Sequence, residues 1–216
     1  MGIRDSVMLL HYTLALGPIL RFGAGQDGTG QDSAREARES LESMASAGVL
    51  LMTEVGRSNS HLSPRTIASH DPATGGFVLT TPDAQAAKFP TSTAHPAVAK
   101  TAAVYATLVH GGRERGVFVF AVPLRHADGT VPPGVRIVPA PETTGLPVDY
   151  AAVLLDGVHV PHGAWLRDGA SIDADGAFHD PAGSPAARLT RPMGVAPPVW
   201  RGVLTADARV TPAAFP

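Results

Sequence analysis

The chain has 216 residues, of which 44% are hydrophobic and 17% are charged, a composition typical of a globular domain. A net charge of −2 gives no reason to expect a nucleic-acid partner. The absence of cysteine excludes disulfides and thiolate metal ligands. The apolar run at residues 7–20 is shorter than the ~20 residues needed to cross a bilayer. No signal peptide is apparent, so we expect a cytoplasmic protein without a membrane partner.

The first part of the chain is predicted to be helical. Residues 5–22 read as a helix whose apolar side is expected to carry Val7, Leu10 and Leu14 at helical spacing, and Pro18 is expected to kink or break the last turn. A second helix is expected from Ser33, a capping residue, to about Ser46. Leu41 and Met44 mark its predicted apolar side.

From residue 49 onward the apolar pattern changes to that of strands. Short runs of alternating or continuous apolar residues are separated by turns rich in Gly, Pro and Asp. Seven or more short strands at this spacing predict an antiparallel β-barrel or sandwich. The fold class is therefore mainly β with flanking helices. The expected strands are 49–53, 65–70, 76–81, 101–109, 117–123, 135–138 and 151–160.

The last part of the chain differs in composition from the rest. Residues 168–187 are rich in Asp, Gly, Ala and Pro and are predicted to form a long loop. A short helix is expected over about residues 198–209, with paired prolines in its first turn. Its apolar side, with Val199 and Val203, has no visible partner in the chain, which suggests docking on another polypeptide. The predicted divisions are residues 1–47, 48–167 and 168–216.

One segment between the helices and the strands combines features of a binding site. An apolar run at residues 49–52 leads into the small hydroxyl and amide side chains of Met52–Ser60. Main-chain N–H groups and hydroxyls gathered at a strand end can bind phosphate or the edge of a polar ring. The same residues are also common in plain turns, and the local sequence leaves both interpretations open.

The order of several segments carries more information than any one of them. Met52–Ser60 reads Met-Thr-Glu-x-Gly-x-Ser-Asn-Ser, and Lys88–Ser92 reads Lys-Phe-Pro-Thr-Ser. Val117–Arg125 and Val158–Leu166 follow at family-like spacing. In this order the chain resembles the acyl-CoA dehydrogenase and acyl-CoA oxidase superfamily over residues 10–167, and more closely its oxidase branch.

The resemblance implies that residues 48–167 form the middle β-domain of that family, which carries one side of an FAD site. Thr53 would then hydrogen-bond the isoalloxazine ring, and Ser92 would lie beside flavin N5. Ser58 and Asn59 would approach the pyrophosphate. Hydrogen bonds to the ring edge tune flavin electronics, and the ring face needs an apolar cover. The cofactor-binding residues implied are Thr53, Ser58, Asn59, Pro90, Thr91 and Ser92.

The sequence also departs from the family pattern. Ser58 replaces a glycine, and Pro90 replaces a tryptophan that packs on the flavin ring in the family. Most of the family's amino-terminal helical domain and its carboxy-terminal helical bundle have no counterpart in these residues. In the family, that bundle supplies the glutamate that takes the α-proton, so no catalytic residue is assigned here. Glu54 is expected to be structural.

The resemblance therefore implies one subunit of a split, heteromeric FAD-dependent acyl-CoA dehydrogenase/oxidase-like enzyme. It would act in α,β-dehydrogenation of an acyl-CoA or acyl-carrier-protein thioester. A second polypeptide would carry the helical bundle and the catalytic glutamate. Abundant Ala, Gly and Pro fit a high-GC bacterial source, and the split fits a secondary-metabolism pathway.

An alternative is a non-catalytic scaffold or stabilising subunit of a flavoenzyme complex that no longer binds flavin itself. The replacements at Ser58 and Pro90 motivate this second interpretation.

Two other signals are too weak to predict a metal site. His159 and His162 flank Val160-Pro161, but no third ligand is evident. Asp173 and Asp175 faintly resemble a calcium loop whose remaining ligands and terminal glutamate are missing.

Overall fold

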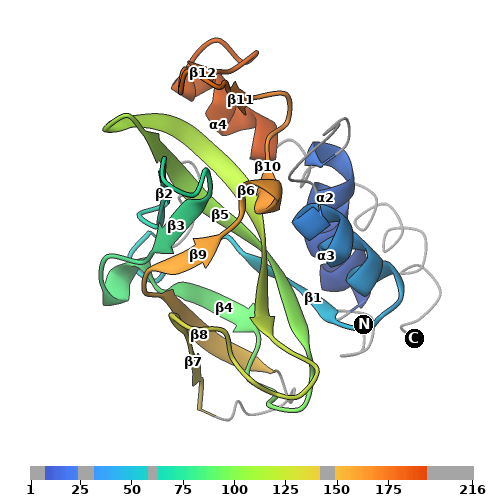
Figure 1. Ribbon diagram of the computed structural model, residues 1–216. Coiled ribbons are helices and arrows are strands. Elements are labelled where there is room, and N and C mark those ends of the chain that lie inside the picture. Colours follow the sequence, from blue (N-terminus) through green and yellow to red (C-terminus); the bar gives the residue numbers. More distant parts are fainter. Residues whose placement is uncertain (1–7, 24–31, 58–62, 142–148, 194–216) are drawn as a thin grey trace, which may run out of the picture.

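The protein is described by a computed structural model that covers residues 8–23, 32–57, 63–141 and 149–193. A strongly curled sheet forms a half-barrel, and the amino-terminal helices cover one of its faces (Figure 1). The mainly β class with flanking helices is confirmed. Within these ranges, no helix is long and apolar enough to cross a membrane.

The main sheet has seven strands in the order β10-β6-β5-β2-β3-β9, with β1 also paired to β5. The long hairpin of β5 and β6 forms its centre (Figure 1). β1 and β2 both run parallel to β5, so the sheet is mixed where a purely antiparallel one was expected. The strands are β1 (Ala47–Leu51), β2 (Ile67–His70), β3 (Phe77–Thr80), β5 (Lys100–His110), β6 (Arg113–Arg125), β9 (Val158–Val160) and β10 (Trp165–Leu166).

Two smaller sheets accompany the half-barrel. Three strands form an antiparallel sheet in the order β4-β8-β7, below the main sheet in Figure 1. β11 and β12 form a two-stranded hairpin near the carboxy-terminal helix α4. Their bounds are β4 (Lys88–Ser92), β7 (Val135–Pro139), β8 (Tyr150–Leu155), β11 (Ser171–Ile172), β12 (Phe178–His179) and α4 (Pro185–Met193).

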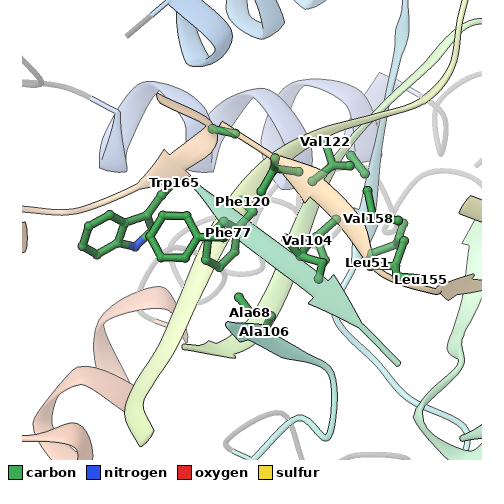
Figure 2. Close-up of a cluster of buried hydrophobic side chains, with 14 of the residues drawn as sticks. Leu51, Ala68, Phe77, Val104, Ala106, Phe120, Val122, Leu155, Val158 and Trp165 are labelled. Atoms are coloured by element: carbon green, nitrogen blue, oxygen red, sulfur yellow. The ribbon is translucent and has the colours of Figure 1, made fainter. Parts of the chain in front are cut away.

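The concave side of the half-barrel holds the main hydrophobic core. Phe77, Phe120 and Trp165 meet edge to face there, with Phe77 5.3 Å from Phe120 and 5.2 Å from Trp165 between ring centroids (Figure 2). Aromatic side chains bury large apolar areas, and this geometry is the one their quadrupoles favour. Residues of β5 and β6 are buried on both faces, which explains why these strands are continuous apolar runs in the sequence.

A second core lies between the outer face of β5 and β6 and the helices η1 (Leu10–Leu16), α2 (Gly17–Phe22) and α3 (Asp32–Glu42). The chain stays helical next to Pro18 but changes helix type there: the π-helix η1 ends at Leu16, and Pro18 lies in the first turn of α2, a position that proline tolerates. The boundary between the two helices thus lies next to Pro18, where a kink or break was expected.

The buried side of the first helix is also not the one predicted. His11 is fully buried, whereas Leu10 and Leu14 are only half-buried. His11 accepts a hydrogen bond from the Gly48 N–H at 2.9 Å through Nδ1, and its Nε2 lies 3.1 Å from the Leu41 carbonyl. One neutral imidazole thus joins η1 to both β1 and α3, and burial lowers its pKa.

The second helix is shorter than predicted. It ends at Glu42, because Met44 has a φ of +59° that a helix cannot include. Leu41 is buried as predicted, but Met44 is 49% exposed and does not belong to the apolar side.

Three further predictions of local structure were wrong. The expected strand 151–160 divides into β8 and β9 at a tight turn around Gly157, which has a φ of +63°. Lys88–Ser92, which was not among the expected strands, forms β4. Residues 168–187 contain the β11–β12 hairpin and the start of α4 instead of one long loop. The helix expected at 198–209 lies outside the described residues.

Candidate functional site

The two segments that carry the sequence motif lie side by side in the fold. The Phe89 N–H donates to the Thr53 carbonyl at 3.1 Å, and the Val55 N–H donates to the Ala87 carbonyl at 3.1 Å. An isolated antiparallel bridge joins Glu54 to Lys88 between them. The chain after β1 therefore runs along β4. This brings together Thr53 and Pro90, two of the residues implied as cofactor-binding by the sequence.

Thr53 makes a second, side-chain contact with β4. Its hydroxyl donates to the Phe89 carbonyl at 2.7 Å, and the side chain is half-buried. A hydroxyl has one donor and two acceptor lone pairs. The donor is used within the protein, so the oxygen remains able to accept a hydrogen bond from a ligand N–H.

A buried ion pair lies directly behind this edge. Nζ of Lys88 is 2.9 Å from Oε1 of Glu54, and the two side chains are 0% and 1% exposed. The same ammonium donates to the Tyr105 carbonyl at 2.7 Å and to the Met52 carbonyl at 3.3 Å. Burial lowers the pKa of Lys88 to about 8, although the Glu54 carboxylate opposes that shift.

The Glu54 carboxylate has no spare capacity for chemistry. It accepts the Arg65 N–H at 2.7 Å, and it accepts the Thr66 N–H and hydroxyl at 2.9 and 2.7 Å. Burial alone would raise the pKa of Glu54, but the Lys88 charge and these hydrogen bonds outweigh it, so the pKa is lowered. This arrangement fits a structural role, since a carboxylate so stabilised is a poor base.

The remaining predicted residues of β4 differ in where they point. Phe89 is 37% exposed and Pro90 is also exposed, which gives an apolar surface beside Thr53. Thr91 faces inward, where its hydroxyl donates to the Ala151 carbonyl at 2.8 Å and lies 2.7 Å from the Thr93 hydroxyl. A ligand on the surface would reach Thr91 only through its main chain.

Ser92 is half-buried at the end of β4. Its carbonyl accepts a 2.8 Å hydrogen bond from Lys100, whose ammonium also pairs with Asp149 at 2.9 Å. Both lysines of the chain, Lys88 and Lys100, are therefore buried and hold β4 in place. Lysines are rarely buried without a partner. Because the sequence contains only two lysines, their positions were a signal from which their role in holding β4 could have been inferred.

Two predicted residues, Ser58 and Asn59, lie outside the described part of the chain. Just before them, Gly56 lies so close to Gln85 that an added Cβ would be 2.6 Å from the Gln85 Cβ. The glycine of the motif is thus required for packing within the protein.

One of the two weak metal signals, that of Asp173 and Asp175, has a structural explanation. Asp173 accepts the Asp175 and Ala177 N–H groups at 3.0 and 2.8 Å and pairs with His179 at 2.9 Å, so its oxygens stabilise the β11–β12 turn. In the part of the chain that the structure describes, no three His, Cys, Asp or Glu side chains come together as metal ligands.

Comparison with known proteins relates the chain to acyl-CoA oxidases. No model of a known protein family matches. The peroxisomal acyl-coenzyme A oxidase 3 of Arabidopsis thaliana is 30% identical over 132 residues, which are 61% of this chain and 19% of the relative. Human peroxisomal acyl-coenzyme A oxidase 3 is 27% identical over 184 residues, or 84% of this chain and 26% of the relative. The chain thus spans about a fifth to a quarter of these relatives' length.

Solved structures give the same result for the fold. Arabidopsis thaliana acyl-CoA oxidase 1 superposes with a TM-score of 0.74 at 23% identity, covering 94% of this chain and 30% of that one. Acyl-CoA oxidase-2 of Caenorhabditis elegans, bound with FAD, ascaroside-CoA and ATP, has a TM-score of 0.69 at 22% identity. The matched region includes 85% of this chain and 26% of the Caenorhabditis elegans chain. The resemblance expected from the sequence is confirmed.

Proposed function

We propose that this chain, a partial acyl-CoA oxidase-like domain, supplies the β-domain side of an FAD and acyl-thioester site. The observation that carries the proposal is the Thr53–Phe89 hydrogen bond of 2.7 Å. It fixes a half-exposed acceptor oxygen beside the exposed apolar surface of Phe89 and Pro90. A flat ring with polar N–H groups on its edge and apolar faces matches this combination.

Each residue has a role that follows from its contacts. Thr53 accepts a hydrogen bond from the ring edge, and Phe89 and Pro90 cover part of the ring face. The buried Glu54–Lys88 pair keeps these residues in register and does not touch the ligand. When bound, FAD would accept the hydride in α,β-dehydrogenation of the acyl thioester. The related FAD-bound oxidase structure supports the choice of cofactor.

The proton acceptor for this reaction is proposed to lie on a second polypeptide. The acid of the motif, Glu54, is unsuited to the task because its oxygens are fully hydrogen-bonded and buried. The outer side of the helical layer exposes Met8, Tyr12 and Leu20, which offers an apolar surface to a partner. The proposed arrangement is a heteromeric enzyme whose partner carries the helical bundle and the glutamate.

Co-expression with the product of the neighbouring open reading frame tests the proposal. The complex is expected to be yellow with bound flavin, and Thr53→Ala should reduce its flavin content, whereas Thr53→Ser should retain it. A colourless complex in which neither variant differs from wild type would contradict flavin binding.

The split arrangement is tested separately from flavin binding. Purification from the source cells should give an intact species of 22.3 kDa that co-purifies with a second polypeptide. A single longer flavoprotein containing this sequence would contradict the split and leave the flavin site untouched.

A second candidate is a scaffold subunit without flavin. It is favoured by Pro90, which offers less ring surface than the tryptophan of the family, and by the inward-facing Thr91. The double replacement of Thr53 and Ser92 by alanine separates the two candidates. Unchanged flavin content and activity in the complex would favour the scaffold.

A further inference from the structure

A cavity of about 780 Å³ opens where the half-barrel fails to close. β9 ends the strand order on one side, and on the other the short β10 pairs with only Val119 and Phe120 of β6. Among the described strands, none therefore pairs with the second half of β6 on that side (Figure 1). Ala121–Pro123 of β6 and Val158–Val160 of β9 line the cavity, together with residues of α3.

This seam cavity is separate from the edge that carries Thr53. Ala45 and Ser46, which precede β1, line the cavity, whereas Thr53 follows the other end of β1. Thr53 lies seven positions after Ser46, with the five residues of β1 between them, and a strand rises about 3.3 Å per residue, so the two places lie roughly 23 Å apart. The cavity is thus distinct from the flavin edge proposed above.

The walls of the seam cavity are unsuited to pairing with an additional strand. Pro123, Pro132, Pro133 and Pro161 all line it. Proline has no N–H to donate to a neighbouring strand and is a common device against edge-to-edge pairing. A volume of this size with mostly apolar walls falls instead within the range of about 300–1,000 Å³ for small-molecule sites.

The hydroxyl groups in the cavity wall leave a donor unused. Ser40 donates to the Ser46 hydroxyl at 3.0 Å, and the Ser46 and Thr101 hydroxyls lie 2.8 Å apart. These three hydroxyls share two hydrogen bonds, so one proton has no acceptor among the described residues. All three residues line the cavity.

Arg125 adds a positive charge to the same wall. Its Nη1 donates to the Gly129 carbonyl at 3.1 Å, while its buried Nε has no partner. No carboxylate pairs with Arg125 within the described ranges. A buried donor without an acceptor costs about 1–3 kcal/mol. Glu36 and Asp156 also line the cavity, but both are exposed, so water screens their charge.

We propose that the seam cavity binds a small amphiphilic carboxylate. Its tail would lie along the prolines and the valines of β6 and β9. Its carboxylate would be held by the guanidinium of Arg125, which takes carboxylates through two parallel N–H groups. A modest turn of the guanidinium would give Nε the acceptor it lacks. This site is independent of flavin binding.

Calorimetric titration with decanoate and with decanol tests the site, because the two probes share a chain length and differ in charge. At low ionic strength, decanoate is expected to bind one site per chain, at least about tenfold more tightly than decanol, the ratio typical of one charge-assisted contact. Arg125→Met should remove the difference between the probes. Arg136→Met, at an exposed arginine of β7 outside the cavity, should preserve it.

The position of the site is tested by filling the cavity. Ala99→Phe, at a half-buried lining residue, should weaken both probes at least about tenfold, whereas Ala97→Phe on the exposed surface should not. Circular dichroism checks that each variant folds. If Arg125→Met does not fold, Arg125→Lys replaces it: the lysine keeps the charge but lacks the two parallel N–H groups, so the difference in affinity between the probes should shrink. Equal affinity for the two probes, or an unchanged affinity in Ala99→Phe, would overturn the proposal.

Discussion

The ammonium of Lys88 lies 2.9 Å from Oε1 of Glu54, and solvent reaches neither side chain. Through this pair and its hydrogen bonds, the end of β1, the start of β2, β4 and the middle of β5 meet at one point. The candidate site is built on that point, because Thr53 and Phe89 each adjoin one member of the pair. The ion pair therefore governs both the stability and the shape of this edge.

Breaking the buried pair should be strongly destabilising. Glu54→Gln or Lys88→Met would leave one buried charge without its partner, at a cost of about 3–5 kcal/mol in the free energy of unfolding. Urea denaturation of the purified protein measures this. Arg38→Met is the control: its pair with Glu42 is exposed at 3.6 Å and should contribute only about 0.3–0.5 kcal/mol. Equal losses in the buried and exposed pairs would contradict the interpretation.

A second buried cation should hold the carboxy-terminal helix in place. Arg188 is 1% exposed, pairs with Asp168 and Asp180, and lies 4.6 Å from the centroid of the Phe118 ring. Arg188→Met leaves Asp180 without its partner and is expected to release α4 and the β11–β12 hairpin from β6. Limited proteolysis should then cut within residues 168–193 first.

Arg191 of the same helix is the matched control for that experiment. It pairs with Asp168 at 2.6 Å but is 45% exposed, so Arg191→Met should leave the proteolysis pattern nearly unchanged. If α4 in Arg188→Met were as resistant to proteolysis as in wild type, the ion pairs of Arg188 would not be what holds this helix in place.

Close packing against Arg188 should make Gly116 intolerant of a side chain. Gly116 has a φ of +102°, and an added Cβ would lie 2.9 Å from Cγ of Arg188. Gly112 also has a positive φ, +70°, but nothing within 4 Å of that position. Gly116→Ala is expected to lower the thermal midpoint more than Gly112→Ala, by the equivalent of at least about 1 kcal/mol. A larger loss at Gly112 would contradict the steric argument.

Acid should destabilise the protein through its partly buried histidines. Burial is the main cause that lowers the pKa of His70, aided by the neighbouring His110 and opposed by Asp71. Burial also lowers the pKa of His162, with further contributions from Arg167 and His70. The unfolded chain therefore binds protons before the folded chain does.

The sign of the pH dependence follows from these pKa directions. Stability should fall as the pH drops below about 6.5, the pKa of an unfolded histidine, until the lowered folded pKa values are passed. Urea midpoints compared at about pH 7.5 and about pH 5.5 measure the loss, which spans the range where histidine titrates. His70→Gln and His162→Gln should each reduce it, whereas His95→Gln, at an exposed position, should not. An identical loss in all three variants would exclude this cause.

The sequence predicted strands better than helices for a physical reason. Apolar runs with turn signals located the strands of the half-barrel, because alternation and Gly/Pro punctuation are local properties. The buried side of the first helix was misassigned, since His11 is buried by hydrogen bonds to Gly48 and Leu41 that depend on distant elements. α4 was missed because its helical segment depends on the ion pairs of Arg188 more than on local propensity.

The candidate site, too, was predicted only in part from the sequence. The motif pointed to Thr53 and to β4, and the structure brings Thr53 beside Phe89 and Pro90. The sequence motif could not indicate that Thr91 faces inward. Strand alternation and a register shift within the β4–β8 pairing decide which side chain points out.

By itself, the sequence determined the mainly β class and the resemblance to acyl-CoA oxidases, and it led to the proposal that Met52–Ser60 forms part of a binding site. These follow from the order and period of residues along the chain. Only the tertiary structure decided that Glu54 is held by Lys88, that Thr53 bonds to Phe89, and that a cavity opens between β6 and β9. These features join residues far apart in the chain, and for the charge of Lys88 the physical reason is that burial makes a partner necessary.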